Sequence, residues 1–235
     1  MARIDKGALT RLEITSEASR QFLETGYSKT TIASIASALD MSKGNLTFYY
    51  KTKEYLLAEL VDILCGFHWK QIEKEADDGI SSIMAFCLDM TAMAAACEDD
   101  EIIRDFFVSA YTSPLCIKVI RKNGQERAKQ VFESYRPDWK DEQFEEAALL
   151  VSGVEYATLI PTGETAGLET RISGALNIIL DIYGIPEETR KLKIQKVFAK
   201  DYRRIGKQAI TDFKNYVEKS NAQAFYDLLK MKYPI

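Results

Sequence analysis

The sequence predicts an all-α protein, built from a three-helix head that contains a helix-turn-helix and a larger helical bundle behind it. Two observations support this expectation. Residues 30–53 contain two short helix patterns separated by a turn, and from residue 54 onward apolar residues recur at three- and four-residue steps in successive segments. A chain of 235 residues also has ample material for a substantial hydrophobic core.

The stretch 30–53 predicts two short helices and the start of a third. Thr30 can cap the first helix, Ser42 the second and Thr52 the third, because hydroxyl side chains accept hydrogen bonds from the free amides of a first helical turn. Residues 39–41 leave room only for a turn, so the first two helices must cross steeply and share a core. In this arrangement the second helix enters the major groove of DNA.

The outward face of the second helix is polar, aromatic and cationic, without a carboxylate. Its residues are Lys43, Asn45, Thr47, Phe48 and Tyr49. Such a surface suits base edges and phosphates, and the amide of Asn45 can pair bidentately with adenine. The alternative is an ordinary solvated helix face, since any small helical domain has a polar exterior.

Charge is distributed unevenly along the chain. Residues 1–53 hold eight Lys or Arg and five Asp or Glu, a balance of +3. Because the whole chain carries −4, the remainder carries −7. This asymmetry favours a head that faces DNA and a body that DNA repels.

Several classes of protein lack support in the sequence. The four cysteines form no CxxC pair and the single histidine has no ligand cluster, so we expect free thiols in a reducing cytoplasm and no metal or cofactor. No uncharged apolar run approaches the ~18 residues that a membrane span needs. The acidic run 98–101 favours a solvated helix start, and no nucleophile–base pair or phosphate loop indicates an enzyme, so we expect no catalytic residue.

An amphipathic helix over residues 8–25, stopped by Gly26, completes the head. With it, the first 60 residues resemble the TetR family of bacterial transcriptional regulators. The positions that carry this resemblance are Ile14, Ala18, Phe22, Gly26-Tyr27, Thr30-Thr31-Ile32, Ile35-Ala36, Ser42-Lys43-Gly44, Leu46, Tyr49-Tyr50, Lys51 and Lys53-Glu54. The resemblance implies a head at 1–51 that binds double-stranded DNA and a regulatory domain at 52–235 that binds ligand and dimerises.

The resemblance also implies roles for individual residues. Thr30, Thr31 and Ser42 are expected to contact phosphates through hydroxyls and helix N-terminal amides, and Lys53 to grip a phosphate. Two departures from the family pattern have structural consequences. Asp40 stands in place of a turn glycine and must adopt a left-handed conformation, and Tyr50 replaces a phenylalanine, so its hydroxyl needs a partner.

The body contains soft apolar segments with a few polar residues inside them. The helix pattern at 81–97 is apolar nearly all round and rich in Met, which suits either a ligand pocket or a packed core. Its one internal charge, Asp89, needs a partner, as does Glu155 in the apolar segment 141–160. The candidate ligand-binding residues are His68, Trp69, Phe86, Met90, Phe107, Tyr111, Glu155 and Tyr156.

Residues 190–207 predict one basic amphipathic helix, with eight cations against a single acid. It could meet an acidic partner, although most such faces are only solvated. We therefore hold two hypotheses. The first is a ligand-responsive repressor that binds a palindromic operator as a homodimer and is released by a small, largely apolar effector. The alternative is a helical interaction protein whose modified head acts through a protein partner docked near Lys196.

Overall fold

The computed structural model describes residues 6–77, 81–160 and 166–230. These residues form eleven α-helices and one 3₁₀ turn, and no strand occurs among them, so the predicted all-α class is confirmed. The helices are α1 Lys6–Glu24, α2 Ile32–Ala38, α3 Lys43–Tyr49, α4 Lys53–Asp77, α5 Ser82–Asp99, α6 Glu101–Thr112, α7 Pro114–Phe132, α8 Asp141–Leu159, α9 Leu168–Ile182, α10 Glu187–Phe198 and α11 Tyr202–Lys230, with η1 at Glu133–Tyr135.

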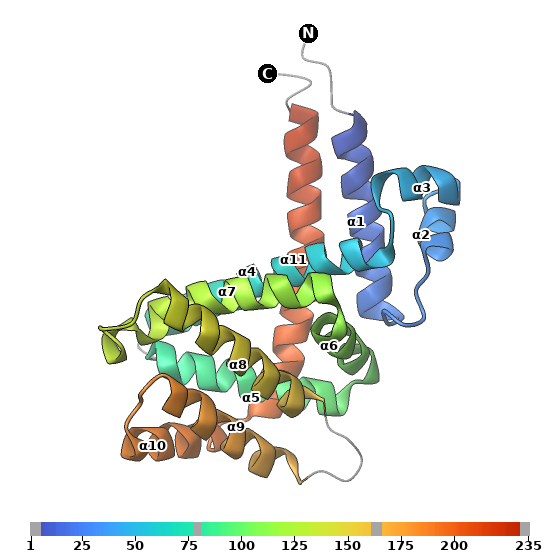
Figure 1. Cartoon of the computed structure of the whole chain (residues 1–235). Helices are drawn as coiled ribbons and strands as arrows, with labels where there is room; N and C mark the ends of the chain where they lie inside the picture. Colours follow the sequence, from blue (N-terminus) through green and yellow to red (C-terminus); the bar gives the residue numbers. More distant parts are fainter. Residues whose placement is uncertain (1–5, 78–80, 161–165, 231–235) are drawn as a thin grey trace.

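The molecule has a small head and a larger body (Figure 1). Helices α1, α2 and α3 make the head, and the long helix α4 leads from it into the body. The C-terminal helix α11 crosses the body against α5 and continues beside α1 of the head. No helix of the described residues is long and apolar enough to cross a membrane.

The head is held together by a small apolar core. Ile14 and Phe22 of α1, Ile35 of α2 and Leu46 of α3 are completely buried. Each lies on the inner face that the three- and four-residue spacing predicts. Removing any one of these large side chains would leave a cavity costing about 2–5 kcal/mol of the free energy of unfolding.

The turn between α2 and α3 uses the conformation that the sequence requires. Asp40 has φ +51°, which makes it the one non-glycine residue with positive φ in the described part of the chain. Asp tolerates this left-handed region because its short polar side chain can bond locally. The predicted left-handed Asp40 is confirmed.

The cap of α2 is Thr31 rather than the predicted Thr30. The Thr31 hydroxyl accepts from the Ser34 amide at 2.9 Å, and the Ser34 hydroxyl accepts from the Thr31 amide at 3.0 Å. This reciprocal capping box satisfies two of the free amides at the helix start. Thr30 is instead buried, with its hydroxyl donating to the Gly26 carbonyl at 2.8 Å.

The body is organised around α5, whose residues from Ile83 to Cys97 are buried with the exception of Asp89. Helices pack around it on most sides, as its nearly uniform apolar character predicts. Helix α11 approaches α5 closely at Gly206, where the space beside the glycine is filled by the Ala92 carbonyl. Only a residue without a Cβ fits there.

The predicted single basic helix over 190–207 is wrong. Helix α10 ends at Phe198 and α11 begins at Tyr202. The single acid of the run, Asp201, lies in the break and its carboxylate accepts from the Arg204 amide at 3.1 Å, which caps α11. The cations are also not one surface, since Arg203 pairs with Glu98 and Asp99 of the acidic run after α5.

Candidate nucleic-acid interface and interior cavity

Helix α3 presents its polar face to solvent. Ser42 caps the helix by accepting from the Asn45 amide at 3.1 Å, and Leu46 anchors the opposite face in the head core. Lys43 and Asn45 are exposed, and Phe48 is 81% exposed. A single exposed apolar side chain is normal on a protein surface, so Phe48 is notable only for lying beside Lys43 and Asn45 on the same short helix.

Two of the predicted groove-facing residues are partly buried and make contacts within the head. Thr47 is half-buried and its hydroxyl donates to the Gly44 carbonyl at 3.0 Å. Tyr49 is half-buried, with the Arg11 guanidinium 5.5 Å from its ring centroid. Both side chains are held by the head itself, which leaves Lys43, Asn45 and Phe48 as the freely accessible set.

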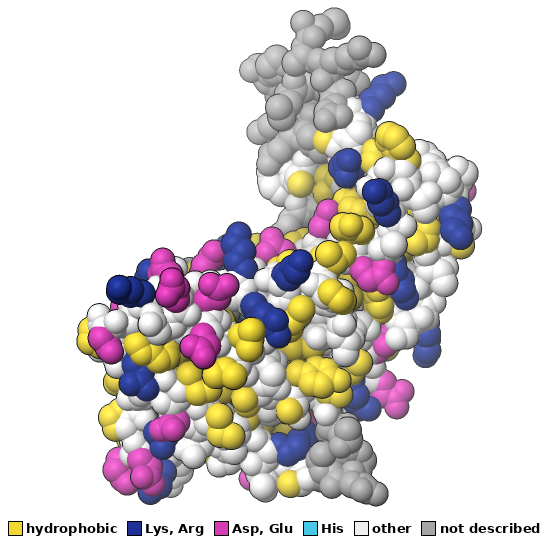
Figure 2. Space-filling model, viewed as in Figure 1, with side chains coloured by type: hydrophobic (Ala, Val, Ile, Leu, Met, Phe, Trp, Pro, Cys, Tyr) yellow, Lys and Arg dark blue, Asp and Glu magenta, His cyan; other side chains and the backbone are white. Residues whose placement is uncertain are grey.

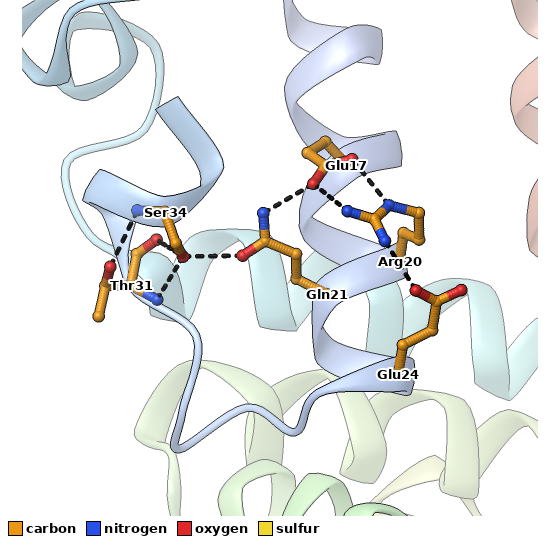
Figure 3. A network of polar contacts seen from close by, with 6 residues as sticks. All are labelled: Glu17, Arg20, Gln21, Glu24, Thr31 and Ser34. Carbon is orange, nitrogen blue, oxygen red and sulfur yellow. Dashed lines mark hydrogen bonds and ion pairs between the residues drawn. The ribbon is translucent and has the colours of Figure 1, made fainter. Parts of the chain in front are cut away.

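A polar network fixes the start of α2 against α1 (Figure 3). The Ser34 hydroxyl donates to Gln21 Oε1 at 2.7 Å, and Gln21 Nε2 donates to Glu17 at 2.7 Å. Glu17 is held in turn by the Arg20 guanidinium, whose hydrogen bond lowers the pKa of the Glu17 carboxyl. This chain of contacts orients the free amides at the N-terminus of α2, which can bind a phosphate.

Side chains of α4 and α6 form hydrogen bonds with the loop between α1 and α2. Lys53, the first residue of α4, donates through its ammonium to the Tyr27 carbonyl at 2.9 Å and the Thr30 carbonyl at 3.1 Å. From α6, the Asp105 carboxylate accepts from the Ser28 amide at 2.8 Å and also from the Ser28 hydroxyl. The structure therefore places Lys53 on internal carbonyls, where it ties the head to α4.

Thr30 is a correction to the predicted phosphate contacts. Its side chain is only 1% exposed and its hydroxyl is committed to Gly26, so it cannot reach the DNA backbone. Thr31 and Ser42 are exposed at helix N-termini and stay candidates. The head surface visible in Figure 2 carries mostly Lys and Arg among its charged side chains, which suits an anionic partner.

The body contains a cavity of about 200 Å³ between α4, α5, α6, α7 and α8. This volume lies below the ~300–1,000 Å³ of typical ligand sites, so the cavity suits a compact molecule. Seven of the eight candidate ligand-binding residues line it. They are His68, Trp69, Phe86, Met90, Phe107, Tyr111 and Glu155.

Tyr156 does not line the cavity, and this prediction is corrected. Its side chain is 39% exposed on the outside of α8, next in sequence to Glu155, which points inward. One residue along a helix turns a side chain by about 100°, so neighbours in sequence face different surroundings.

The polar side of the cavity is a connected set of charged groups. The His68 imidazole donates from Nδ1 to Asp89 at 2.9 Å, and the Tyr111 hydroxyl donates to Glu155 at 2.8 Å. Between the two carboxylates lies Arg127 of α7, whose guanidinium nitrogens are 3.9 Å from Asp89 and 3.5 Å from Glu155. Asp89 thus has the internal partner that a buried carboxylate needs.

Burial and neighbouring charge shift the titration of this set. Burial raises the pKa of Glu155, against the lowering influence of Arg127 and the Tyr111 hydrogen bond. Burial also raises the pKa of Tyr111 well above its ordinary value, so that it stays a donor. For Arg127, burial works to lower the pKa, but Glu155 and Asp89 outweigh it and the pKa is raised. Arg127 is therefore a permanent cation in the cavity wall.

The head is similar in sequence to a known protein family. Residues 14–60 match the family described as bacterial regulatory proteins, tetR family. The head of the chain is therefore similar to the TetR family. The match covers α1 from Ile14, α2, α3 and the start of α4, and it agrees with the resemblance seen in the sequence. Curated protein sequences gave no match.

Solved structures give weaker likenesses over most of the chain. A gamma-butyrolactone receptor described as ArpA-like is 17% identical over 83% of this chain and 96% of its own, with a TM-score of 0.46. The TetR-family protein CprB of Streptomyces coelicolor, solved with its operator sequence, is 20% identical over 83% of this chain and 97% of its own, with a TM-score of 0.45.

Arg127 is among the cavity residues that the sequence did not indicate. It lies in a helix with many cations, and nothing in its local sequence separates it from Arg121, which instead donates to Ser152 at 3.1 Å outside the cavity. The TetR-family pattern stops at residue 60 and gives no guidance there. Glu155 and Asp89 are recognisable in the sequence as buried charges, but their common cation is determined by which residue of α7 lies between them.

Proposed function

We propose that the protein is a ligand-responsive transcriptional repressor, with a DNA-binding domain at residues 1–51 and a regulatory domain at 52–235. It binds a palindromic operator as a homodimer and a small, largely apolar effector releases it. One observation carries this proposal, namely that α4 belongs to both functional regions. Lys53 at its start holds the head loop, and His68 and Trp69 in its middle line the cavity.

A second helix makes the same connection. Helix α6 contributes Phe107 and Tyr111 to the cavity wall and Asp105 to the grip on the head loop at Ser28. A ligand that changes the packing of α4 and α6 would therefore change the position of the head. By linkage, such an effector binds the DNA-incompetent arrangement more tightly, and operator DNA weakens effector binding by the same factor.

An exposed apolar face on α8 and α9 supports the homodimer. Leu149, Leu150 and Tyr156 of α8 and Ile178 of α9 are between 39% and 53% exposed. Gly153 lies among them with no neighbouring atom near its Cβ position, so a second helix can approach closely. Hydrophobic side chains gather over this part of the body in Figure 2. Contiguous apolar surface of this kind is typical of subunit interfaces.

DNA binding is tested by fluorescence anisotropy on the DNA that flanks the protein's own gene, at low salt. We expect saturable binding to a palindrome with half-sites about one helical turn, or a small multiple, apart. Lys43→Met on α3 should weaken binding and reduce the dependence of log K on log salt by about one. Lys196→Met, exposed on α10 far from the head, is the matched control and should change neither (Figure 1).

Two results would argue against the proposal. Failure of the wild-type protein to bind any palindrome at low salt would contradict a DNA-binding regulator. Loss of binding in Lys196→Met but not in Lys43→Met would place the functional surface on α10, as the protein-partner alternative requires.

The dimer is tested by sedimentation velocity with Leu150→Glu. A carboxylate in the middle of the apolar face should convert a dimer to a monomer while leaving helix content unchanged, because Leu150 is half exposed in the single chain. Lys196→Met again serves as control. A wild-type protein that sediments as a monomer at micromolar concentration would contradict the homodimer.

A further inference from the structure

The charged set in the cavity wall restricts what the cavity can bind. Arg127 makes no hydrogen bond with Asp89 or Glu155, since its nitrogens stand 3.9 Å and 3.5 Å from their oxygens. These separations are longer than the 2.7–2.9 Å of a charge-assisted hydrogen bond. The guanidinium side chain keeps 21% of its surface exposed although it sits inside the protein, and it lines the cavity. Its N–H groups are thus free to donate to a ligand.

Two other donors of this cluster are directed at its carboxylates. The His68 Nδ1 hydrogen points to Asp89 and the Tyr111 hydroxyl hydrogen points to Glu155. Arg127 is therefore the donor of this cluster that stays open, and a ligand must offer it an acceptor. Its aromatic neighbour Phe86, 5.2 Å below the guanidinium, holds the group in place from the apolar side.

The same cluster disfavours charged ligands. A ligand carboxylate bonded to Arg127 would lie close to Asp89 and Glu155, and like charges repel strongly in a poorly hydrated interior. A ligand cation would be attracted by Asp89 and Glu155 but repelled by the Arg127 guanidinium between them, which stays charged, so it gains little from the cluster. An uncharged acceptor such as a carbonyl oxygen avoids both penalties, because it satisfies the guanidinium without adding charge.

The rest of the wall is mainly apolar, although Asn123, Glu126 and Gln130 of α7 also line it. Trp69, Met90 and Phe107 supply flat and adaptable surfaces from three different helices. The volume of about 200 Å³ leaves room for a small ring system with short substituents.

From this geometry we infer that the effector is an uncharged, compact, ring-sized molecule whose carbonyl oxygen accepts a hydrogen bond from Arg127, while Asp89 and Glu155 exclude organic anions. The inference rests on the proposed effector cavity and adds the chemical class of its ligand.

The experiment compares four small aromatic probes of similar size by isothermal titration on the full-length protein without DNA. Acetophenone offers a neutral carbonyl, ethylbenzene offers no acceptor, benzoate is an anion and benzylammonium a cation. We expect acetophenone to bind about tenfold more tightly than each of the others, since one hydrogen bond to a charged group and one avoided charge repulsion each give about that factor.

Two variants identify the groups responsible. Glu155→Gln removes a negative charge but keeps an oxygen that can accept from Tyr111, so it should admit benzoate with at least about tenfold improved affinity. Arg127→Lys keeps the cation but loses the planar fork, and the compact ammonium should be drawn to the two carboxylates and away from the ligand, so acetophenone binding should weaken. Arg121→Lys, on the same helix outside the cavity, is the matched control and should bind acetophenone as the wild type does.

The inference is overturned if benzoate or benzylammonium binds the wild type as tightly as acetophenone, if ethylbenzene does so, or if no probe binds. It is also overturned if Glu155→Gln still rejects benzoate. Because none of these titrations contains DNA, each of these failures is distinct from a failure to bind an operator palindrome, which would count against the proposed function instead.

Discussion

The outward face of α3 and the cavity in the body are both polar surfaces, but they are built in different ways. On α3 the polar contacts are local, with Ser42 bonding Asn45 and Thr47 bonding Gly44 three residues away. In the cavity the partners come from different helices, with His68 and Asp89 separated by 21 residues and Tyr111 and Glu155 by 44. The first surface is displayed by a helix, and the second exists only when five helices are assembled.

This difference predicts how the two regions respond to substitution. Lys43, Asn45 and Phe48 are exposed, so changing them should alter binding and leave the free energy of unfolding nearly unchanged. Arg127, Asp89 and Glu155 hold one another inside the body, so changing them should alter stability and binding together.

The largest effect should come from Arg127→Met. The variant fills similar space but leaves Asp89 and Glu155 without their shared cation, and breaking a buried ion pair from one side costs about 3–5 kcal/mol of the free energy of unfolding. Chemical denaturation measures it. Arg121→Met on the same helix, which loses one contact to Ser152, should cost clearly less. Equal costs for the two variants would mean that the buried cluster adds nothing to stability.

The next effect concerns α3. Asn45→Ala should cost about 1–3 kcal/mol of operator binding at one base pair, because a bidentate amide–adenine contact is worth this much. The melting temperature should not change, since Asn45 is exposed. Binding to a set of operators with single base-pair changes measures the effect. A uniform loss on all sequences would instead identify Asn45 as a contact to the DNA backbone.

The difference between local and assembled surfaces also explains what the sequence could reveal. The helix-turn-helix was predictable because its signals are short-range: the Ser42 cap, the left-handed Asp40 and the buried positions of α1. The need of the Tyr50 hydroxyl for a partner was also recognisable, and Glu59 meets it at 3.0 Å.

The predictions that were wrong or incomplete depended on contacts that local sequence does not reveal. Thr30 and Thr31 are adjacent hydroxyls with equal capping propensity, and the choice depended on the loop carbonyl of Gly26 that takes the Thr30 hydrogen. The break at Asp201 was hidden by a continuous basic composition, because one capping acid looks like any other surface acid. Of the charged cluster in the cavity, the sequence indicated only that Asp89 and Glu155 are buried acids in need of a partner. Arg127 became identifiable when the structure placed α7 against α5 and α8.

A smaller effect on stability is expected from removing the N-cap of α3. Ser42→Ala removes the cap on a helix of only seven residues and should cost about 1 kcal/mol of the free energy of unfolding. It should also weaken DNA binding, because the same hydroxyl is a candidate phosphate contact. Ser42→Gly should cost only a few tenths of a kcal/mol. Ser37→Ala, exposed on α2, is the control for removing a serine hydroxyl from the head.

The smallest effect is a pH dependence that only the assembled surface can produce. Burial raises the pKa of Glu155 above its ordinary value of 4.5. Between these two pKa values the folded protein holds a proton that the unfolded chain releases, so the free energy of unfolding falls as pH rises through this window. Glu155→Gln cannot titrate, so the stability of the wild type relative to this variant should decline from acid pH toward neutral pH. Denaturation midpoints measured from about pH 4 to pH 8 test this.

Glu145→Gln, exposed on the outside of α8, is the control for removing a carboxylate from the same helix. If the difference in stability between the wild type and Glu155→Gln stays constant across this range, the Glu155 carboxyl has the same pKa in the folded and the unfolded chain. The cavity and the surface of α3 would then not differ in how their groups titrate.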